Sequence, residues 1–221
     1  MKVLTVPSSG SVAGTTASRN RFGQYVRTRA IPTNPNSARQ TVTRSTLAAT
    51  SGSWQLLSFA EQTAWNEYAA SHPRIDSLGQ TIVLSGAQMY ASINCMMINA
   101  GYAAVVDAPS GETIDPPILG AVAIATDAAT VAFTPTPVEA GRKILIYCSP
   151  PASFGVTFFR DLRFLQAVPS AGTSPANVLA AMTAKYGTIL TGQRYAFRLY
   201  QISSGGQVST WSNQVTDSVD A

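Results

Sequence analysis

The stretch "RYAFRLYQISSGGQVSTWSNQV", residues 194 to 215, decides the fold of the C-terminal part of the chain. Polar and apolar side chains alternate along it, as in strands that have one buried face. In its middle, "SSGGQ", residues 203 to 207, provides the small residues and the glycines that a tight hairpin turn requires. The stretch therefore predicts two neighbouring antiparallel strands joined by a turn.

The same alternation extends upstream as far as Ile118, in "VAIAT", "TVAFT", "KILIYCS" and "LRFLQAV". Pro116 and Pro117 precede it and interrupt any regular element. Some seven short strands in roughly 100 residues are typical of a sandwich of the immunoglobulin type. We therefore expect residues 116–221 to form a C-terminal β-sandwich domain.

"ILTGQRYAFRLYQISSGGQVSTWSNQV", residues 189 to 215, resembles the final two strands of fibronectin type III domains. The resemblance implies a tyrosine corner at Leu190 and Tyr195, in which the phenol bonds to nearby backbone. The chain departs from that family at Phe133, which stands where such domains usually carry a core tryptophan. We expect Tyr195 and Phe133 in the core of the sandwich, with Trp211 at least partly buried.

Residues 37–115 are predicted to form a small, mainly helical domain. The patterns "SFAE" and "SGAQ", which begin at Ser58 and Ser85, are capping boxes that start helices. Apolar residues recur after each box at helical spacing, which indicates a core face more than a cofactor site. These residues are Ala60, Ala64, Trp65, Tyr68 and Ala69 after the first box, and Met89, Ile93, Met96 and Met97 after the second.

Residues 1–36 are predicted to form an extended basic arm. Residues 1 to 60 hold seven basic residues and no acidic one, whereas the rest of the chain holds eight basic and eleven acidic residues. In "SRNRFGQYVRTRAIPTNPN", residues 18 to 36, Gly23 makes a strand a better interpretation than a helix. A single strand would place Arg19, Arg21, Tyr25, Arg27 and Arg29 on one face, with Phe22 and Val26 on the other.

Such a basic stretch has three interpretations: a solvated arm, a nucleic-acid site or a protein interface. Arginines interleaved with aromatic residues suit a phosphate track, so nucleic acid is possible as a partner, but the basic residues are too thinly spread to make it the better choice. A neighbouring sheet edge that carries carboxylates fits both faces of the arm. The predicted assembly interface is Arg19, Arg21, Phe22, Tyr25, Val26, Arg27 and Arg29.

The N-terminal part resembles an uncharacterised group of proteins associated with bacteriophage and prophage structural regions. The resemblance is carried by "RNRFGQYVRTR", by "PTNP" and by "AWNEYA" farther along the chain. It implies a virion component that is made in the host cytoplasm, and it attaches no activity to the chain.

The sequence carries no pattern of catalytic or metal-binding chemistry. His72 is the only histidine, and it follows a helix, where capping the helix end is a better interpretation than pairing with Ser71. Cys95 and Cys148 lack metal-ligand spacing, and two buried thiols are favoured over a disulfide. We therefore expect no enzyme activity, no cofactor, no metal and no small-molecule substrate. The start lacks a secretory apolar segment, and no run is long enough to span a membrane.

The sequence thus predicts an α+β multidomain protein with an extended N-terminal arm, a small helical domain and a C-terminal fibronectin III/Ig-like β-sandwich. Its predicted function is that of a non-enzymatic phage virion structural protein, such as a head- or tail-associated decoration or accessory protein. Its partners would be other virion proteins or copies of itself. The alternative is a bacterial surface or extracellular module that recognises carbohydrate or a receptor through the sandwich.

Overall fold

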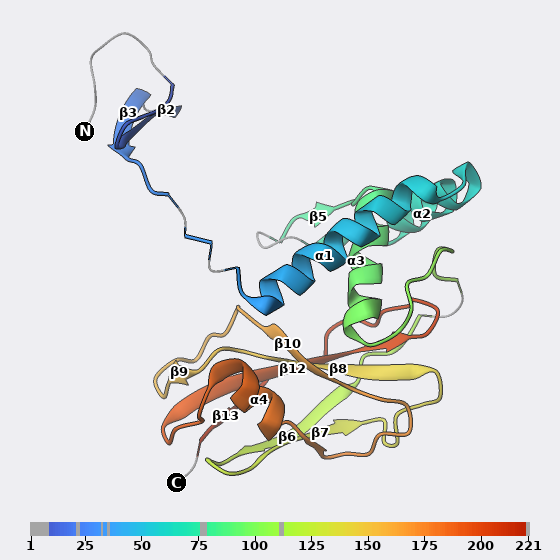
Figure 1. Ribbon diagram of the computed structural model, residues 1–221. Coiled ribbons are helices and arrows are strands. Elements are labelled where there is room, and N and C mark those ends of the chain that lie inside the picture. The colour runs from blue at the N-terminus through green and yellow to red at the C-terminus, as the bar shows by residue number, and fades with distance from the viewer. Residues whose placement is uncertain are drawn as a thin grey trace. The chain divides into compact units, whose positions relative to one another are not determined.

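The protein has α+β architecture, as predicted, with helices and antiparallel sheets that form two compact units (Figure 1). The units are Met1–Val42 and Thr43–Ala221, and each is described by itself. The structure is a computed structural model. It describes residues 9–20, 23–31, 33–34, 36–75, 79–110 and 113–219.

The first unit contains a three-stranded antiparallel sheet with β2 in the centre. Its strands are β1, Gly10–Val12, β2, Thr15–Asn20, and β3, Gly23–Thr28. This corrects the single extended strand expected from the sequence, because the chain folds back twice. Gly23 has φ 112°, which side-chain-bearing residues rarely adopt and which suits the turn into β3.

Three helices open the second unit or lead into it: α1, Ala38–Ser53, α2, Phe59–Ser71, and α3, Gly86–Asn99. A single 3₁₀ turn, η1, Trp54–Leu56, separates α1 from α2. Both predicted capping boxes are confirmed, since the hydroxyls of Ser58 and Ser85 each accept a hydrogen bond from the backbone N–H three residues later. Between α2 and α3, the short strands β4, Arg74–Ile75, and β5, Thr81–Ile82, pair with each other.

Two antiparallel sheets follow, and they enclose one core. The smaller sheet has the order β11-β7-β6, and the larger has the order β10-β8-β12-β13, with β9 also paired to β12. Helix α4, Leu179–Tyr186, lies between β11 and β12 in the sequence. The strands are β6, Ile118–Ile124; β7, Ala129–Thr134; β8, Arg142–Cys148; β9, Ala152–Ser153; β10, Arg163–Val168; β11, Ala176–Asn177; β12, Gln193–Ser203; and β13, Val215–Ser218.

Tyr195 and Phe133 both lie in the core between the two sheets, as predicted. The predicted tyrosine corner at Leu190 and Tyr195 differs from the expectation in its hydrogen bonds. The Tyr195 hydroxyl donates to the side-chain oxygen of Gln193 at 2.8 Å, and the Leu190 backbone N–H donates to the same oxygen at 3.0 Å. A glutamine amide therefore joins the phenol to the backbone. Trp211 is 44% exposed and packs edge-on against Tyr200.

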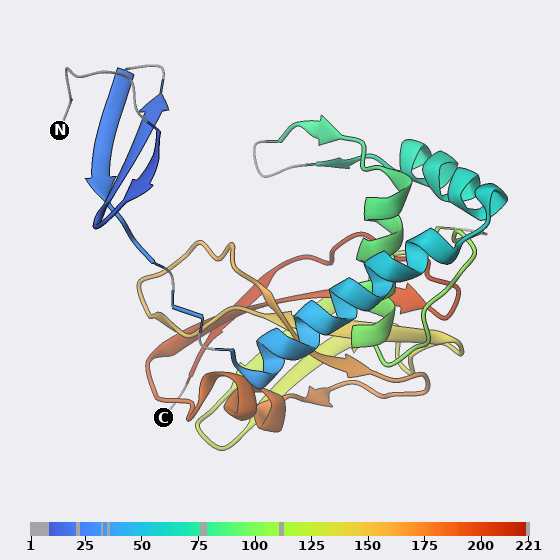
Figure 2. The same ribbon diagram turned by 45° about the horizontal axis from the view of Figure 1, so that its top comes forward.

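A second core lies on the opposite face of the large sheet. Leu145 of β8 and Tyr200 and Ile202 of β12 are buried there beneath residues of α2 and α3. Figure 2 shows α3 standing over this sheet. Strands β8 and β12 are therefore covered on both faces. The predicted boundary near residue 116 does not divide the compact units, because the helices and the sheets share this core. The covering residues are Trp65, Ala69, Met89, Tyr90, Ile93, Met97 and Ala100.

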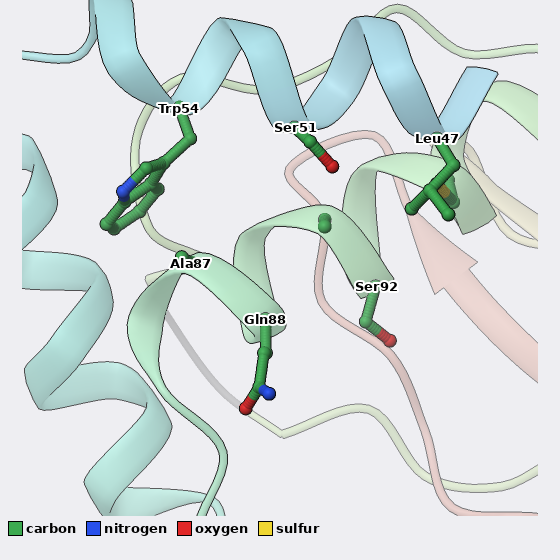
Figure 3. Close-up of a pocket in the computed structure, with 8 residues that line it drawn as sticks. Leu47, Ser51, Trp54, Ala87, Gln88 and Ser92 are labelled. Atoms are coloured by element: carbon green, nitrogen blue, oxygen red, sulfur yellow. The ribbon is translucent and has the colours of Figure 1, made fainter. Parts of the chain in front are cut away.

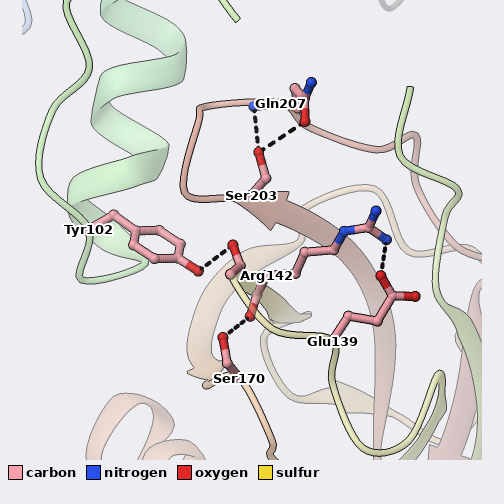
Figure 4. A network of polar contacts seen from close by, with 7 residues as sticks. Tyr102, Glu139, Arg142, Ser170, Ser203 and Gln207 are labelled. Carbon is pink, nitrogen blue, oxygen red and sulfur yellow. Dashed lines mark hydrogen bonds and ion pairs between the residues drawn. The ribbon is translucent and has the colours of Figure 1, made fainter. Parts of the chain in front are cut away.

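Polar contacts at the end of α3 reinforce this attachment. The ammonium of Lys143, in β8, donates to the carbonyls of Ala100 at 2.7 Å and Gly101 at 3.1 Å. It also lies 4.0 Å from the centre of the Tyr102 ring. A cation at a helix C-terminus satisfies carbonyls that have no partner within the helix and opposes the negative end of the helix dipole. The Tyr102 hydroxyl donates to the Gly141 carbonyl at 3.1 Å (Figure 4).

The same region fixes the start of β8 and the turn after β12 (Figure 4). The Ser170 hydroxyl donates to the Arg142 carbonyl at 2.7 Å, and the Arg142 side chain forms an ion pair with Glu139 at 2.5 Å. The predicted hairpin turn is confirmed, because the Ser203 N–H donates to the Gln207 carbonyl at 3.0 Å. These bonds hold the start of β8 and the turn after β12 in place.

Serine hydroxyls replace part of the backbone pairing after this turn. The Ser212 N–H donates to the Leu199 carbonyl, and the Leu199 N–H donates to the Ser212 hydroxyl, both at 2.9 Å. Ser209 exchanges the same two bonds with Gln201, at 2.9 and 2.8 Å. The predicted closing strand is therefore irregular over residues 209–214, and regular pairing resumes at β13.

We predict that residues 117–221 alone are not an independent domain. Removing the helices exposes Leu145, Tyr200 and Ile202. Each exposed side chain then loses about 1.5–3 kcal/mol of stabilisation from apolar burial. The fragment should bind the dye ANS and self-associate in gel filtration, whereas residues 43–221 should do neither. Equal melting temperatures and equal dye binding for the two fragments would show that the helical cover is dispensable.

We also predict that Ser212→Ala destabilises the protein. The substitution leaves the buried Leu199 N–H without its acceptor, which typically costs about 1–3 kcal/mol. Urea unfolding followed by circular dichroism would measure the loss. Ser204→Ala, at an exposed position of the neighbouring turn, is the control and should change the free energy of unfolding by less than about 0.5 kcal/mol.

Candidate assembly surface

The predicted interface residues lie on the hairpin of β2 and β3. Cross-strand partners share a face of a sheet, and Tyr25 pairs with Ser18 while Arg27 pairs with Thr16. Arg19 pairs with Gln24 and therefore lies on the opposite face, together with Val26. The expected grouping of Arg19 with Tyr25 and Arg27 is wrong, because the chain reverses between them. Arg21 and Phe22 lie outside the described residues.

The arginines of this sheet have no acidic partner among the described residues. Neither of the two ion pairs there involves Arg19, Arg27 or Arg29. Arg29 follows β3, and its backbone N–H donates to the Gly14 carbonyl at 2.8 Å, which holds the end of the hairpin. The side chains of Arg27 and Arg29 are exposed. Their charges are therefore available to a partner molecule.

The sheet also lacks a core. None of the described residues between 9 and 42 is buried; Tyr25 and Val26 are only half-buried, and Val12 is 78% exposed. A small sheet is stable in water when it has a hydrophobic face or packs against another element. The described part of this sheet contains no buried residue of its own.

Helix α1 continues this exposed character into the second unit. Thr50 is its one buried residue, although the helix is 16 residues long. Leu47 is 52% exposed. Helices in proteins gain most of their stability by packing an apolar face, and this helix packs little of its surface. The weak packing of α1 was not predicted from the sequence, although "TVTRSTLAATSGS" combines weak helix formers with few apolar residues.

A groove of about 600 Å³ separates this part of α1 from α3. Leu47, Ser51 and Trp54 point into it from α1 and η1, towards α3 (Figure 3). The Trp54 ring lies 5.6 Å from the ring of Tyr90 at one end of the groove. The α3 side is lined by small or unbranched side chains: Ala87, Gln88, Ala91, Ser92 and Cys95.

The groove is suited to binding an apolar segment rather than to chemistry. Its walls are mostly carbon, and Ser51, Gln88 and Ser92 supply hydroxyl and amide groups that could satisfy the backbone of a bound segment. The described residues contain no group of three side chains that could hold a metal ion. The groove therefore offers a docking surface with a few polar contacts.

Among the described residues, His72 contacts a backbone carbonyl and a hydroxyl and forms no ion pair with an acidic residue. One ring nitrogen, Nδ1, lies 2.9 Å from the Tyr68 carbonyl and 2.9 Å from the Ser71 hydroxyl. The ring stacks on Tyr68 with the ring centres 4.1 Å apart. It occupies the C-terminal cap of α2, which is the helix-end position that the sequence indicates.

The two cysteines are free thiols in different surroundings. Cys148 is buried in the core between the sheets, and burial raises the pKa of its thiol well above the usual range. Cys95 is half-buried in the groove, with its sulfur 3.9 Å from the Thr50 hydroxyl. The expectation of two buried thiols holds fully for Cys148 alone.

In the described ranges, no helix combines the length and the apolar composition that crossing a membrane requires. No protein-family model matches the chain, and no curated protein matches it in sequence.

We predict that one thiol per chain reacts with Ellman's reagent at neutral pH. Thiolate is the reactive form, and burial keeps Cys148 neutral, whereas Cys95 is accessible from the groove. Cys95→Ser should abolish the fast reaction, and Cys148→Ser should leave it unchanged. Fast reaction of both thiols in the native protein would contradict the burial of Cys148.

Proposed function

We propose that the chain is a non-enzymatic structural protein of a bacteriophage-type virion that joins the particle through its N-terminal sheet. The observation that carries the proposal is a folded, arginine-bearing sheet without a buried residue. The resemblance of "RNRFGQYVRTR" and "AWNEYA" to phage structural proteins supports the same setting. The particle would supply the apolar burial that the sheet lacks.

The energetics of the sheet favour a role in assembly. Ordering the backbone costs about 1–2 kcal/mol per residue. A backbone hydrogen bond contributes about 0.5–1.5 kcal/mol net, and the sheet adds no buried apolar side chain to this. Binding of a partner would contribute apolar burial, further sheet hydrogen bonds and ion pairs together.

The chemistry of the sheet favours a protein partner. The outer strands β1 and β3 carry backbone groups that can pair with the edge of another sheet. Arg19, Arg27 and Arg29 are too few to form the extended basic track that nucleic acid requires, but they are enough to select carboxylates at an interface. The partners we propose are other virion proteins or further copies of this chain.

We further propose that the C-terminal sheets form a sandwich of the fibronectin type III kind. In chain order, and leaving out the two-residue β9, strands one, two and five form one sheet, while strands three, four, six and seven form the other. The immunoglobulin constant type places its fourth strand in the first sheet instead. The buried Tyr195 also supports the assignment. The bridging Gln193 and the helical cover of β8 and β12 would be departures from that pattern.

One observation favours the alternative, a module that recognises carbohydrate. Trp211, Tyr147 and Tyr200 form a cluster of rings with centres 4.9–5.2 Å apart, and Trp211 keeps 44% of its surface exposed. Exposed rings of this kind can stack on sugar rings. Quenching or enhancement of tryptophan fluorescence by host-cell glycans, lost in Trp211→Phe, would support this function.

We predict that Arg27→Gln with Arg29→Gln weakens incorporation into particles at low salt and that the difference from the unaltered chain shrinks as salt rises. Exposed ion pairs are screened over about 8–10 Å at ordinary ionic strength, so at high salt the pairs that these arginines form contribute little in the unaltered chain as well. Quantitative mass spectrometry of purified particles at several salt concentrations would measure occupancy.

Arg160→Gln with Arg163→Gln removes the same charge from the second unit and is the matched control, which should leave occupancy unchanged. Deletion of residues 1–31 should give a folded, soluble protein that is absent from the particles. Normal occupancy of this truncated chain would overturn the proposed function.

A further inference from the structure

The charges of the chain are divided into segments of opposite sign. Residues 1–44 contain seven basic residues and no acidic one, whereas residues 45–139 contain eight acidic residues and one basic residue, Arg74. Segments of opposite charge can attract each other between copies of one protein. Contacts of this head-to-tail kind generate rings or filaments. A second copy of this chain is therefore a partner whose charge fits the N-terminal region.

The exposed apolar groups of the N-terminal region and of the groove between α1 and α3 are also complementary. Ile31 is 76% exposed in the extended segment after β3, directly after Arg27 and Arg29. The apolar groove between α1 and α3 is open to solvent, and its wall includes Leu47 and Trp54. The segment after β3 presents a branched apolar side chain, and the groove has no apolar occupant among the described residues.

We infer that the groove between α1 and α3 receives the segment around Ile31 of a second copy, with Arg27 and Arg29 of that copy near the acidic side chains of α2. This inference rests on the proposed function, because it names the partner of the N-terminal region. On α2, which follows Trp54 in the chain, Glu67 is exposed, whereas Glu61 is half-buried and its carboxylate accepts hydrogen bonds from the N–H and the hydroxyl of Ser58 at 2.6 and 2.7 Å.

The dimensions agree with this occupant. From Leu47 to Trp54 the helical rise is about 1.5 Å per residue, which gives a groove roughly 10 Å long. An extended chain advances about 3.3 Å per residue, so the groove accommodates about three residues. Ala30 and Ile31 fit within that length. The side chains of Ser51, Gln88 and Ser92 line the groove and offer hydrogen-bonding groups to the backbone of the segment.

The electrostatics of the Trp54 end agree as well. Burial raises the pKa of Tyr90, a hydrogen bond with Ser53 lowers it, and the charge of the Glu61 carboxylate raises it by a smaller amount, which places that carboxylate within electrostatic range of Tyr90. Tyr90 contacts Trp54, with ring centres 5.6 Å apart. An arginine two residues before Ile31 would reach a carboxylate beside this end and neutralise it.

The chain contains the means for a direct test. Cys95 lines the groove and Cys148 is buried, so a thiol introduced by Ile31→Cys has one accessible native partner. Mild oxidation of the full-length variant should give disulfide-linked dimers and higher multimers on a non-reducing gel. Mass spectrometry should identify the link between position 31 and Cys95.

Two matched controls test whether the cross-link between position 31 and Cys95 is specific. Cys95→Ser in the same variant should remove the multimers. Val12→Cys places a thiol on a side chain of similar exposure, 78% against 76%, and should give at least tenfold less linked product. Equal linking from both positions would mean random collision and would overturn the inference.

Mixing ¹⁵N-labelled and unlabelled protein distinguishes links between copies from links within one chain. Mixed-isotope cross-links are expected; links found only within one chain, or no links, would overturn the second copy as the occupant. If truncation of residues 1–31 nevertheless removes the protein from particles, the proposed function stands and the groove assignment alone fails.

A second variant tests the groove without a new thiol. Ala91→Phe fills the groove and should weaken self-association of the full-length chain at least tenfold in sedimentation velocity, without lowering its melting temperature. Ala103→Phe, at an exposed position outside the groove, is the control and should leave self-association unchanged. Unchanged self-association in Ala91→Phe would overturn the inference.

Discussion

Burial of β8 and β12 on both faces is the constraint on which the second unit depends. Each strand places one set of side chains between the two sheets and the other set under the helices. Leu145, Tyr200 and Ile202 would otherwise form an apolar surface in water, so α2 and α3 are needed to complete the sheet. The cap that Lys143 provides at the end of α3 then fixes the position of that helix on the sheet. The large sheet and the helices therefore share one of the two cores of this unit.

The N-terminal region differs from the second unit because it lacks a buried core in its described part. Residues 9–42 include no buried side chain in their described part, and α1 adds Thr50 alone. Order in its described part comes from backbone hydrogen bonds between the three strands, without a buried core. The chain thus combines a unit that has two cores with an N-terminal region that has none in its described part.

Local chemistry could be predicted from the sequence, and long-range packing could not. The capping boxes at Ser58 and Ser85 depend on residues three apart, and the Ser203 turn on five consecutive residues, so a short window contains the whole cause. The reversal between β2 and β3 was missed because period-two alternation is the same in one long strand and in a hairpin. The helical cover did leave a signal, since "KILIYC" and "YAFRLYQI" contain adjacent apolar residues, as strands buried on both faces do. The groove depends on how far α1 stands from α3, which no local pattern specifies.

The serine contacts after the hairpin have a consequence for how sheets of neighbouring copies can meet. Ser209 and Ser212 use their hydroxyls as acceptors for β12, and each hydroxyl also donates to the next carbonyl along its own chain. Residues 209–214 therefore lie beside β12 without forming a strand. A regular strand here would offer an incoming strand an even row of backbone groups, which is the usual route to uncontrolled growth of sheets. The irregular border therefore disfavours extension of the large sheet by an added strand at that position.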